Sequence, residues 1–293
     1  DRSKVLDILI GIFSIEDHRS RHDEGIKMMG AKLAQSIPAR ILIAEDNQIN
    51  QKLAMNIFEG LGYSPVMVSN GLEVIDRLRH EDFDLIFMDV QMPELDGLEA
   101  TRFVLNKMGL KHFPYVIAMT AFALEGDKEK CIEAGMSDYI SKPFMIEEIV
   151  DKIKVWKGKS AENDIITVTA ASPAEKSVLD QNVLARLKDL IDGNDDTFFL
   201  KVIDMFIDQS VEVVERIAVE FKNGNLKEVS AQSHKLKGSA LNIGAMRLAE
   251  VCKQLEIQAR ENDVAGSNNL LVKVRQEAIS AREAIHTMLQ KGI

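Results

Sequence analysis

Acidic residues follow two apolar segments that have the composition of buried β-strands. Glu45 and Asp46 follow residues 40–44, and Asp89 follows residues 85–88. Parallel strands present their carboxyl ends at one edge of a sheet, so these three carboxylates should share one crevice. Like charges at such close range need a counter-charge, and a hard divalent cation such as Mg²⁺, or Mn²⁺ in its place, supplies one. The spacing therefore predicts an oxygen-ligand cation site.

A hydroxyl and an ammonium group are expected at the same edge. Thr120 follows the apolar segment 115–119, and Lys142 follows residues 138–140. Phosphoryl transfer to a carboxylate needs a nucleophile, a cation and hydrogen-bond donors for the phosphoryl oxygens. With Asp89 as the nucleophile, Lys142 would pair with one phosphoryl oxygen and Thr120 would hydrogen-bond another.

The expected cation ligands come from both acidic strand ends. Asp46 and Asp89 would bind the ion directly, and the backbone carbonyl of Gln91 would add a ligand. Glu45 would act mostly through water. Strand-end acids can also serve only as caps of the following helices, because Asp and Asn are favoured N-cap residues. The cation site is the better interpretation because a hydroxyl and an ammonium group accompany the acids at neighbouring strand ends.

A histidine in a helical segment is the second candidate for chemistry. At about 100° per residue, His234 lies ~160° away from the apolar stripe marked by Leu236, so it is expected to face water. Lys237 and Gly238 should lie on the same exposed face. Lys237 could pair with a phosphoryl group on the imidazole, and Gly238 would let another protein approach the backbone. A neutral imidazole can accept and release a phosphoryl group near neutral pH.

Two structural units are expected to position these residues. Apolar segments alternate with helical periodicity from residue 40 to 156, which predicts a doubly wound α/β unit. Right-handed crossovers make its five strands parallel, with their acidic ends at one edge. The strand order 2-1-3-4-5 is what the family resemblance described below implies. The expected strands are residues 40–44, 65–68, 85–88, 115–119 and 138–140, and the helices begin near Gln48, Gly71, Asp96, Asp127 and Met145.

The second unit is expected to be entirely helical. Residues 158–178 are rich in small and polar side chains and are typical of a linker. Over residues 179–293 apolar side chains recur at spacings of three and four, with Gly or Asn breaks at 192–194, 223–225 and 262–269. This pattern predicts an antiparallel four-helix bundle. A flexible linker of about 20 residues spans roughly 25 Å, which would let the two units of one chain meet.

Composition and charge exclude several classes of protein. The 293 residues suffice for two cores, and the net charge of -10 argues against a nucleic-acid surface, which needs a basic face. Cys131 and Cys252 lack metal-ligand spacing, which suits a reducing compartment. The longest apolar run, residues 5–15, contains Asp7 and is too short to span a membrane. We therefore expect a cytoplasmic location without direct membrane contact in this fragment.

Residues 1–36 form a helical lead outside both units. They begin without an initiator methionine, and we expect a remnant of an upstream domain or a dimerising pair of helices. His18 and His22 have the i, i+4 spacing of a metal site, but no third ligand is nearby. Other histidines, such as His80 and His112, are expected to be solvated surface residues.

The α/β segment resembles the receiver domain of two-component signalling. The resemblance covers residues 37–157 and rests on the strand-end acids, the threonine and the lysine, together with the DVQMPELDG loop and the SKPF turn. It implies that Asp89 is the phosphoacceptor and that the bond between Lys142 and Pro143 is cis. Glu45 stands where many members of the family have Asp.

The same resemblance implies a conformational switch. Tyr139 stands at an aromatic position that is coupled, in the family, to the residue at Thr120. On phosphorylation Thr120 would move toward the phosphoryl group, and Tyr139 would fill the space behind it. The alternative is that Tyr139 is a half-buried edge residue without a switching role.

The helical segment resembles the histidine phosphotransfer (HPt) domain. The resemblance covers residues 179–289 and rests on the HKLKGSA string, which contains His234, and on the NIGA that follows. Receiver, linker and HPt domain in this order resemble the C-terminal part of a hybrid sensor histidine kinase, which can be membrane-anchored as a whole. The resemblance implies a phosphorelay: a kinase phosphohistidine donates to Asp89, Asp89 donates to His234, and His234 donates to a separate response regulator.

Two other functions remain open. The sequence shows no dimerisation-histidine motif and no nucleotide-binding box, so phosphotransfer without use of ATP is the expected activity. A docking platform would keep both folds and transfer no phosphate, but the complete set of strand-end residues argues against it. A phosphatase with Asp89 as nucleophile would need an acid two residues further on, where Gln91 stands.

Overall fold

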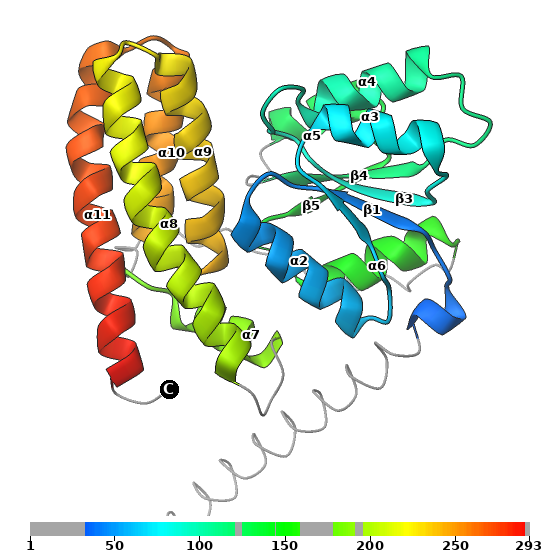
Figure 1. Ribbon diagram of the computed structural model, residues 1–293, viewed down its shortest axis with the longest axis horizontal. Helices are drawn as coiled ribbons and strands as arrows, with labels where there is room; N and C mark the ends of the chain where they lie inside the picture. The colour runs from blue at the N-terminus through cyan, green and yellow to red at the C-terminus, as the bar shows by residue number, and fades with distance from the viewer. Residues whose placement is uncertain (1–32, 121–124, 144, 159–177, 191–195, 291–293) are drawn as a thin grey trace, which may run out of the picture.

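The computed structural model contains a parallel α/β unit and a helical unit (Figure 1). The α/β unit comprises the described residues up to 158, and the helical unit those from 178 onward. Most of the N-terminal lead, with His18 and His22, and nearly all of the expected linker lie outside the described residues. The structure describes residues 33–120, 125–143, 145–158, 178–190 and 196–290.

The sheet has five parallel strands in the order β2-β1-β3-β4-β5, which confirms the predicted topology. Each strand lies within one or two residues of its predicted position. The three central strands are almost completely buried, because helices cover both faces of the sheet. The strands are β1 (Ile41–Ala44), β2 (Val66–Val68), β3 (Leu85–Asp89), β4 (Tyr115–Thr120) and β5 (Asp138–Ser141).

Two apolar clusters hold the helices of the α/β unit against the sheet. One cluster joins α2 (Gln48–Gly60) and α6 (Ile146–Trp156) to one face of the sheet. The other cluster joins α3 (Gly71–His80), α4 (Gly97–Lys107) and α5 (Glu125–Glu133) to the opposite face. The acidic strand ends therefore open at the edge between these two layers.

Polar caps and one glycine determine the local geometry of the acidic edge. The side chain of Asn47 caps α2 by accepting a hydrogen bond from the backbone N–H of Ile49 at 3.0 Å. Gly97 begins α4 directly against the end of β3, where a Cβ atom would lie only 2.1 Å from the carbonyl oxygen of Asp89. Only glycine permits this close approach, because any side chain would displace the backbone of the acidic strand end.

The helical unit consists of five helices within the described residues. Helix α9 contacts α8 and α10, and α11 contacts the same two helices from the other side (Figure 1). The break predicted at 223–225 coincides with the α8–α9 connection. The break predicted at 262–269 is wrong beyond residue 263, because α11 begins at Val264, and the break predicted at 192–194 lies outside the described residues. The helices are α7 (Gln181–Leu190), α8 (Asp196–Lys222), α9 (Leu226–Asn242), α10 (Met246–Arg260) and α11 (Val264–Gln290).

The two units contact each other through α2. This helix lies against α8 and α9, as Figure 1 shows. Ile49 and Leu53 of α2 are buried in the apolar cluster of the helical unit rather than in that of the sheet. Their burial stabilises the contact by about 1.5 kcal/mol or more per side chain. No helix within the described ranges is long and apolar enough to cross a membrane.

Candidate functional site

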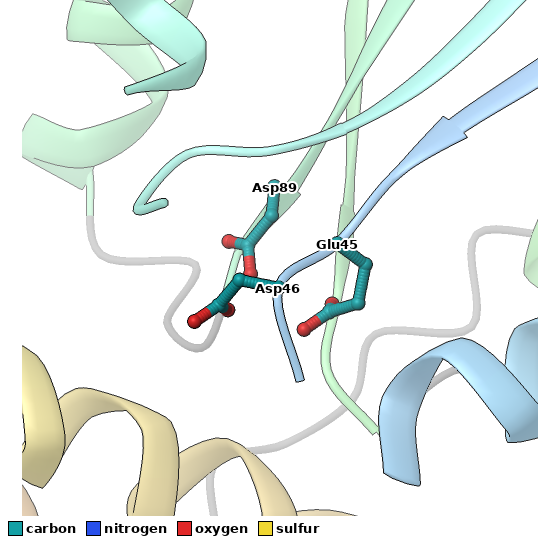
Figure 2. Close-up of side chains that lie close together, drawn as sticks. All are labelled: Glu45, Asp46 and Asp89. Atoms are coloured by element: carbon teal, nitrogen blue, oxygen red, sulfur yellow. The ribbon is translucent and has the colours of Figure 1, made fainter. Parts of the chain in front are cut away.

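Three carboxylates converge at the carboxyl edge of the sheet, as predicted. Glu45 and Asp46 follow β1, and Asp89 is the last residue of the neighbouring strand β3 (Figure 2). One carboxylate oxygen from each residue lies within 4.8 Å of the other two. Glu45 and Asp89 are buried, and Asp46 is partly exposed. The arrangement concentrates negative charge in a largely buried position.

Lys142 supplies a positive charge to this edge. Its Nζ donates hydrogen bonds to Glu45 Oε2 at 2.6 Å and to Asp89 Oδ2 at 2.5 Å. Burial alone lowers the pKa of Lys142, but Asp89 and Glu45 more than compensate and raise it above its usual range. The lysine is therefore a permanent cation. The bond between Lys142 and Pro143 is cis, as the resemblance implies.

One lysine does not neutralise three carboxylates. Burial and the charge of Asp89 together raise the pKa of Asp46 to about 6, against the opposing effects of Lys235 and Lys142. Burial also raises the pKa of Glu45 against the opposing effect of Lys142. Both shifts show that the site carries more negative charge than its surroundings stabilise, which is the condition for binding a divalent cation.

Gln91 and Thr120 flank the acidic cluster. The backbone N–H of Gln91 donates to Asp89 Oδ1 at 3.2 Å, which places this backbone segment beside the carboxylate. Thr120 ends β4, next to β3 in the sheet, and its carbonyl oxygen accepts a hydrogen bond from the backbone N–H of Lys142 at 2.7 Å. The sheet therefore brings together all the strand-end residues that the sequence predicts.

Tyr139 lies on β5 and is partly exposed. The ammonium groups of Lys128 and Lys152 lie 5.1 Å and 5.4 Å from the centre of its ring. Cations at these distances attract the face of an aromatic ring. Lys152 also forms an ion pair with Asp138 at 2.7 Å. The tyrosine, on the edge strand β5, is thus flanked by cations from both faces of the sheet, Lys128 of α5 and Lys152 of α6.

The second site surrounds His234 on α9. Its Nδ1 lies 3.3 Å from Glu256 Oε1 and 3.2 Å from Lys237 Nζ. Lys237 donates to Glu256 Oε2 at 2.7 Å, and Arg260 donates to Glu256 Oε1. Burial alone raises the pKa of Glu256, but the hydrogen bond and charge of His234 and those of Lys237 lower it to about 2. Glu256 is therefore an ionised carboxylate at the centre of a cationic cluster.

Neither Glu256 nor Arg260 is among the sequence-predicted site residues. The available signal is local: Glu256 stands on the buried stripe of α10, between Cys252 and Ala259, where a carboxylate needs a partner. Which partner it has depends on α9, and the sequence of α10 does not contain that information.

Burial lowers the pKa of His234, while its hydrogen bond to Glu256 raises it. The imidazole is therefore neutral at neutral pH. An Nδ1–H that donates to Glu256 leaves the lone pair of Nε2 available as a nucleophile.

His234, Lys237 and Gly238 differ from the expectation that they face water. The His234 side chain is only 13% exposed and that of Lys237 only 4%, and Gly238 is buried. Lys237 is covered because it turns toward Glu256. Gly238 is covered by the α/β unit: a Cβ atom there would lie 3.2 Å from Asn50 Nδ2. The glycine does permit a close approach, but by another part of the same chain.

Hydrogen bonds between the units join the acidic edge to the histidine helix. Asn47 Nδ2 donates to the carbonyl oxygen of Lys235 at 3.0 Å and to Ser239 Oγ at 2.6 Å. Asn242 Nδ2 donates to Asn50 Oδ1 at 2.7 Å. Both asparagines of α2 that make these bonds are almost fully buried. Buried polar groups with satisfied partners specify one docking geometry, because any shift would leave them unpaired.

Glu256→Gln should move the titration midpoint of His234 to lower pH. The substitution removes a negative charge next to Nδ1, so the protonated imidazole loses stabilisation that the neutral form does not need. An NMR titration of the His234 ring protons measures the midpoint. Glu261→Gln, at an exposed position one residue after α10, is the matched control. An unchanged midpoint in Glu256→Gln would contradict the assigned contact.

Family models match both units of the chain. The model of the response regulator receiver domain matches residues 41–154, and that of the Hpt domain matches residues 201–290. The polar-differentiation response regulator DivK of Brucella anthropi is 42% identical over 122 residues, which are 42% of this chain and 98% of that protein. DivK of Brucella ovis is 42% identical over 118 residues, 40% of this chain and 95% of that protein.

Solved structures with similar sequences cover the receiver portion. One is the receiver domain of sensor histidine kinase PA1611 from Pseudomonas aeruginosa, described with a coordinated magnesium ion. It is 38% identical in sequence, the match covers 41% of this chain and 98% of the PA1611 chain, and the TM-score is 0.38. The complex of the Saccharomyces cerevisiae histidine phosphotransfer protein Ypd1 with the receiver domain of Ssk1 matches at 32% identity over 43% of this chain and 93% of that chain, with a TM-score of 0.37.

This chain belongs to the response-regulator receiver family and carries an Hpt domain after its receiver domain. Its function is phosphorelay signalling, as predicted from the two motifs. Receiver and Hpt domains exchange phosphoryl groups with kinases and response regulators in general, so proteins of these two kinds are its partners.

Proposed function

We propose that the chain passes a phosphoryl group between Asp89 and His234 across the contact between its own two domains. One observation carries the proposal: Asn47 binds the backbone carbonyl of Lys235. The residue before Asn47 is Asp46 of the acidic site, and the residue before Lys235 is His234. This contact supports an arrangement in which the acidic edge of the receiver domain lies beside the helix that carries His234.

A divalent cation, Mg²⁺ or Mn²⁺, fits the acidic site. Asp46 and Asp89 offer carboxylate oxygens within 4.8 Å of each other, and Gln91, two residues after Asp89, would add its backbone carbonyl. Glu45 already accepts a hydrogen bond from Lys142, so it would contribute mostly through water. When bound, the cation supplies charge neutralisation for the phosphoryl oxygens.

The transfer itself exchanges one bond for another. A donor phosphohistidine would give its phosphoryl group to a carboxylate oxygen of Asp89, as the N–P bond breaks and the O–P bond forms. Lys142 would pair with one phosphoryl oxygen and Thr120 would donate to another. In the second step the O–P bond would break while the lone pair of His234 Nε2 forms a new N–P bond, with Glu256 stabilising the charge that develops on the ring.

Lys237 would assist from the same side of His234 as Glu256. Its ammonium lies 3.2 Å from Nδ1, and its long side chain would turn from Glu256 toward a phosphoryl group on the ring. Gly238 would serve docking, because its missing side chain leaves room for Asn50 of the receiver domain.

We assign the receiver domain to residues 37–157, the linker to 158–178 and the HPt domain to 179–293, with 1–36 as an N-terminal helical segment that is either a remnant of an upstream domain or a dimerising element. The four long helices α8 to α11 would form an antiparallel four-helix bundle. The contacts of α9 and of α11 with both α8 and α10 support this arrangement.

We also propose that phosphorylation of Asp89 switches the conformation of Thr120 and Tyr139. Thr120 would move toward the phosphoryl group and Tyr139 would follow it inward. The ring would then leave the two cations of Lys128 and Lys152, whose attraction holds it at the surface in this structure. The face formed by α5, β5 and α6 would change its charge and shape in response.

The partners follow from the direction of the relay. The upstream donor would be a histidine kinase core, and the chain would be the C-terminal part of a hybrid kinase located in the cytoplasm. The acceptor after His234 would be a separate response regulator. A docking platform without transfer is less well supported, since the receiver retains its three acids, threonine and lysine together.

Transfer from Asp89 to His234 should proceed at a rate that does not depend on protein concentration. Groups joined in one chain meet as an intramolecular pair. The chain would be loaded with acetyl phosphate and Mg²⁺, and base-stable phosphohistidine would be followed against base-labile acyl phosphate. We expect the same first-order rate across a tenfold range of concentration. A rate proportional to concentration, or no base-stable label at all, would contradict transfer within the chain.

A further inference from the structure

A continuous chain of hydrogen bonds connects the HPt domain with the phosphoacceptor. Asn242 of α9 donates to Asn50 Oδ1 at 2.7 Å, and Asn50 Nδ2 donates to Glu45 Oε1 at 2.9 Å. The second oxygen of Glu45 accepts from Lys142 at 2.6 Å, and Lys142 also donates to Asp89 Oδ2 at 2.5 Å. In each of these hydrogen bonds, one side chain helps to fix the position of the next, from Asn242 through Asn50 and Glu45 to Lys142.

The amide of Asn50 has only one orientation that satisfies both neighbours. Its carbonyl oxygen must face the amide group of Asn242, and its NH₂ group must face the carboxylate of Glu45. The reverse orientation would place two donors together and a carbonyl oxygen against a negative charge. All three side chains are at most 3% exposed, so water does not replace a lost partner. Glu45, which can only accept, therefore fixes the orientation of the Asn50 amide, and Asn242 holds the amide in place by binding its carbonyl oxygen.

Glu45 in turn helps to fix the position of the Lys142 ammonium. This carboxylate shares the ammonium of Lys142 with Asp89, and both bonds lie in a buried site where such bonds are strong. If Asn50 no longer binds Glu45, Oε1 keeps only the longer 3.2 Å hydrogen bond from the backbone N–H of Asn47, so a carboxylate that fixes Lys142 is held less firmly. The ammonium would then be less precisely placed for a phosphoryl group on Asp89.

We propose that Asn50 is a positioning residue through which docking of the HPt domain orders Lys142 beside Asp89. The inference rests on the proposed function, because it gives the docked contact a role in loading the receiver. Docking and loading are then coupled, and by linkage each favours the other. Nearby Asn47 and Ser239 belong to the same interface, but the Asn47 side chain that meets Ser239 does not contact Glu45; only the backbone N–H of Asn47 does, at 3.2 Å from Glu45 Oε1.

The test uses the full chain with His234→Gln, so that label stays on Asp89. Asn242→Ala and Asn50→Ala are compared singly and together by the rate of labelling with acetyl phosphate at saturating Mg²⁺. Ser239→Ala is the matched control, because it removes one interdomain hydrogen bond without touching Asn50. Any effect of weaker docking alone should therefore be common to Asn242→Ala and the control.

We expect Asn242→Ala and Asn50→Ala each to label about fivefold more slowly than Ser239→Ala, the effect of one buried hydrogen bond. The double variant should be no slower than Asn50→Ala, since both changes break one connection. The ¹⁵N signal of the Lys142 ammonium should broaden in Asn242→Ala and persist in Ser239→Ala. Asn50→Ala, in the other domain, gives an independent measurement should Asn242→Ala fail to fold.

Independent, multiplicative effects in the double variant would overturn the proposal, as would equal rates in Asn242→Ala and Ser239→Ala. These outcomes differ from failure of the relay. The relay fails if a chain with His234 forms no phosphohistidine, whereas the labelling rates here involve Asp89 alone.

Discussion

Asp89→Asn should abolish Mg²⁺-dependent labelling of the chain by acetyl phosphate, a loss of about a hundredfold or more. A carboxamide oxygen is a poor nucleophile and cannot form the acyl phosphate. The substitution also removes one of the carboxylates expected to bind the cation and one of the two partners of Lys142. One substitution thus removes the nucleophile, a cation ligand and a partner of Lys142. The remaining residues cannot compensate for these three losses.

Incorporation of radiolabelled phosphate, resolved on a denaturing gel, measures this effect. Asp82→Asn is the matched control because its side chain is 76% exposed and lies before β3, away from its acidic end. The control should label like the unsubstituted chain. Circular dichroism should confirm that Asp89→Asn folds, as expected from the loss of a charge that repels Asp46. Label that survives in Asp89→Asn would disprove the assignment of the phosphoacceptor.

His234→Gln should leave Asp89 fully labelled and abolish phosphohistidine, also by a hundredfold or more. Glutamine has no ring nitrogen to accept the group, but it can keep polar contact with Glu256. Because the route out of Asp89 is closed, the acyl phosphate should also persist longer than in the unsubstituted chain. Transfer to an added response regulator should stop completely.

The two label types separate by their stability in acid and base, so one gel measures both. His286→Gln is the matched control, since it changes an exposed histidine of α11 far along the chain from α9. Base-stable label in His234→Gln would show that another histidine accepts the group. Loss of label from Asp89 in the same variant would show that His234 is needed for loading, which the relay does not require.

The strand pattern of the receiver domain was accessible from the sequence because its causes are local. Apolar segments bounded by turns produce buried parallel strands, and right-handed crossovers place their ends at one edge. Glu45, Asp46 and Asp89 therefore converge wherever those rules hold. The family models and the observed strand order confirm that part of the prediction.

The surroundings of His234 depended on contacts that no local pattern contains. Helical periodicity on α9 places His234 opposite the apolar stripe. Periodicity describes the faces of one helix, however, and contains no information about what packs against them. Glu256 reaches His234 from α10, and Asn50 covers Gly238 from the receiver domain. A surface that one helix leaves open becomes buried when a second domain docks on it.

The sequence by itself determined the two folds, the convergence of the acids with Thr120 and Lys142, and the presence of a histidine with a phosphotransfer motif. Only the tertiary structure decided that the acidic edge and His234 face one another, with Asn47 and Asn50 making the connection. The reason is physical. Strand ends and helix stripes follow from the spacing of neighbouring residues, whereas docking joins side chains almost two hundred residues apart through shape and hydrogen bonds that exist only after both domains have folded.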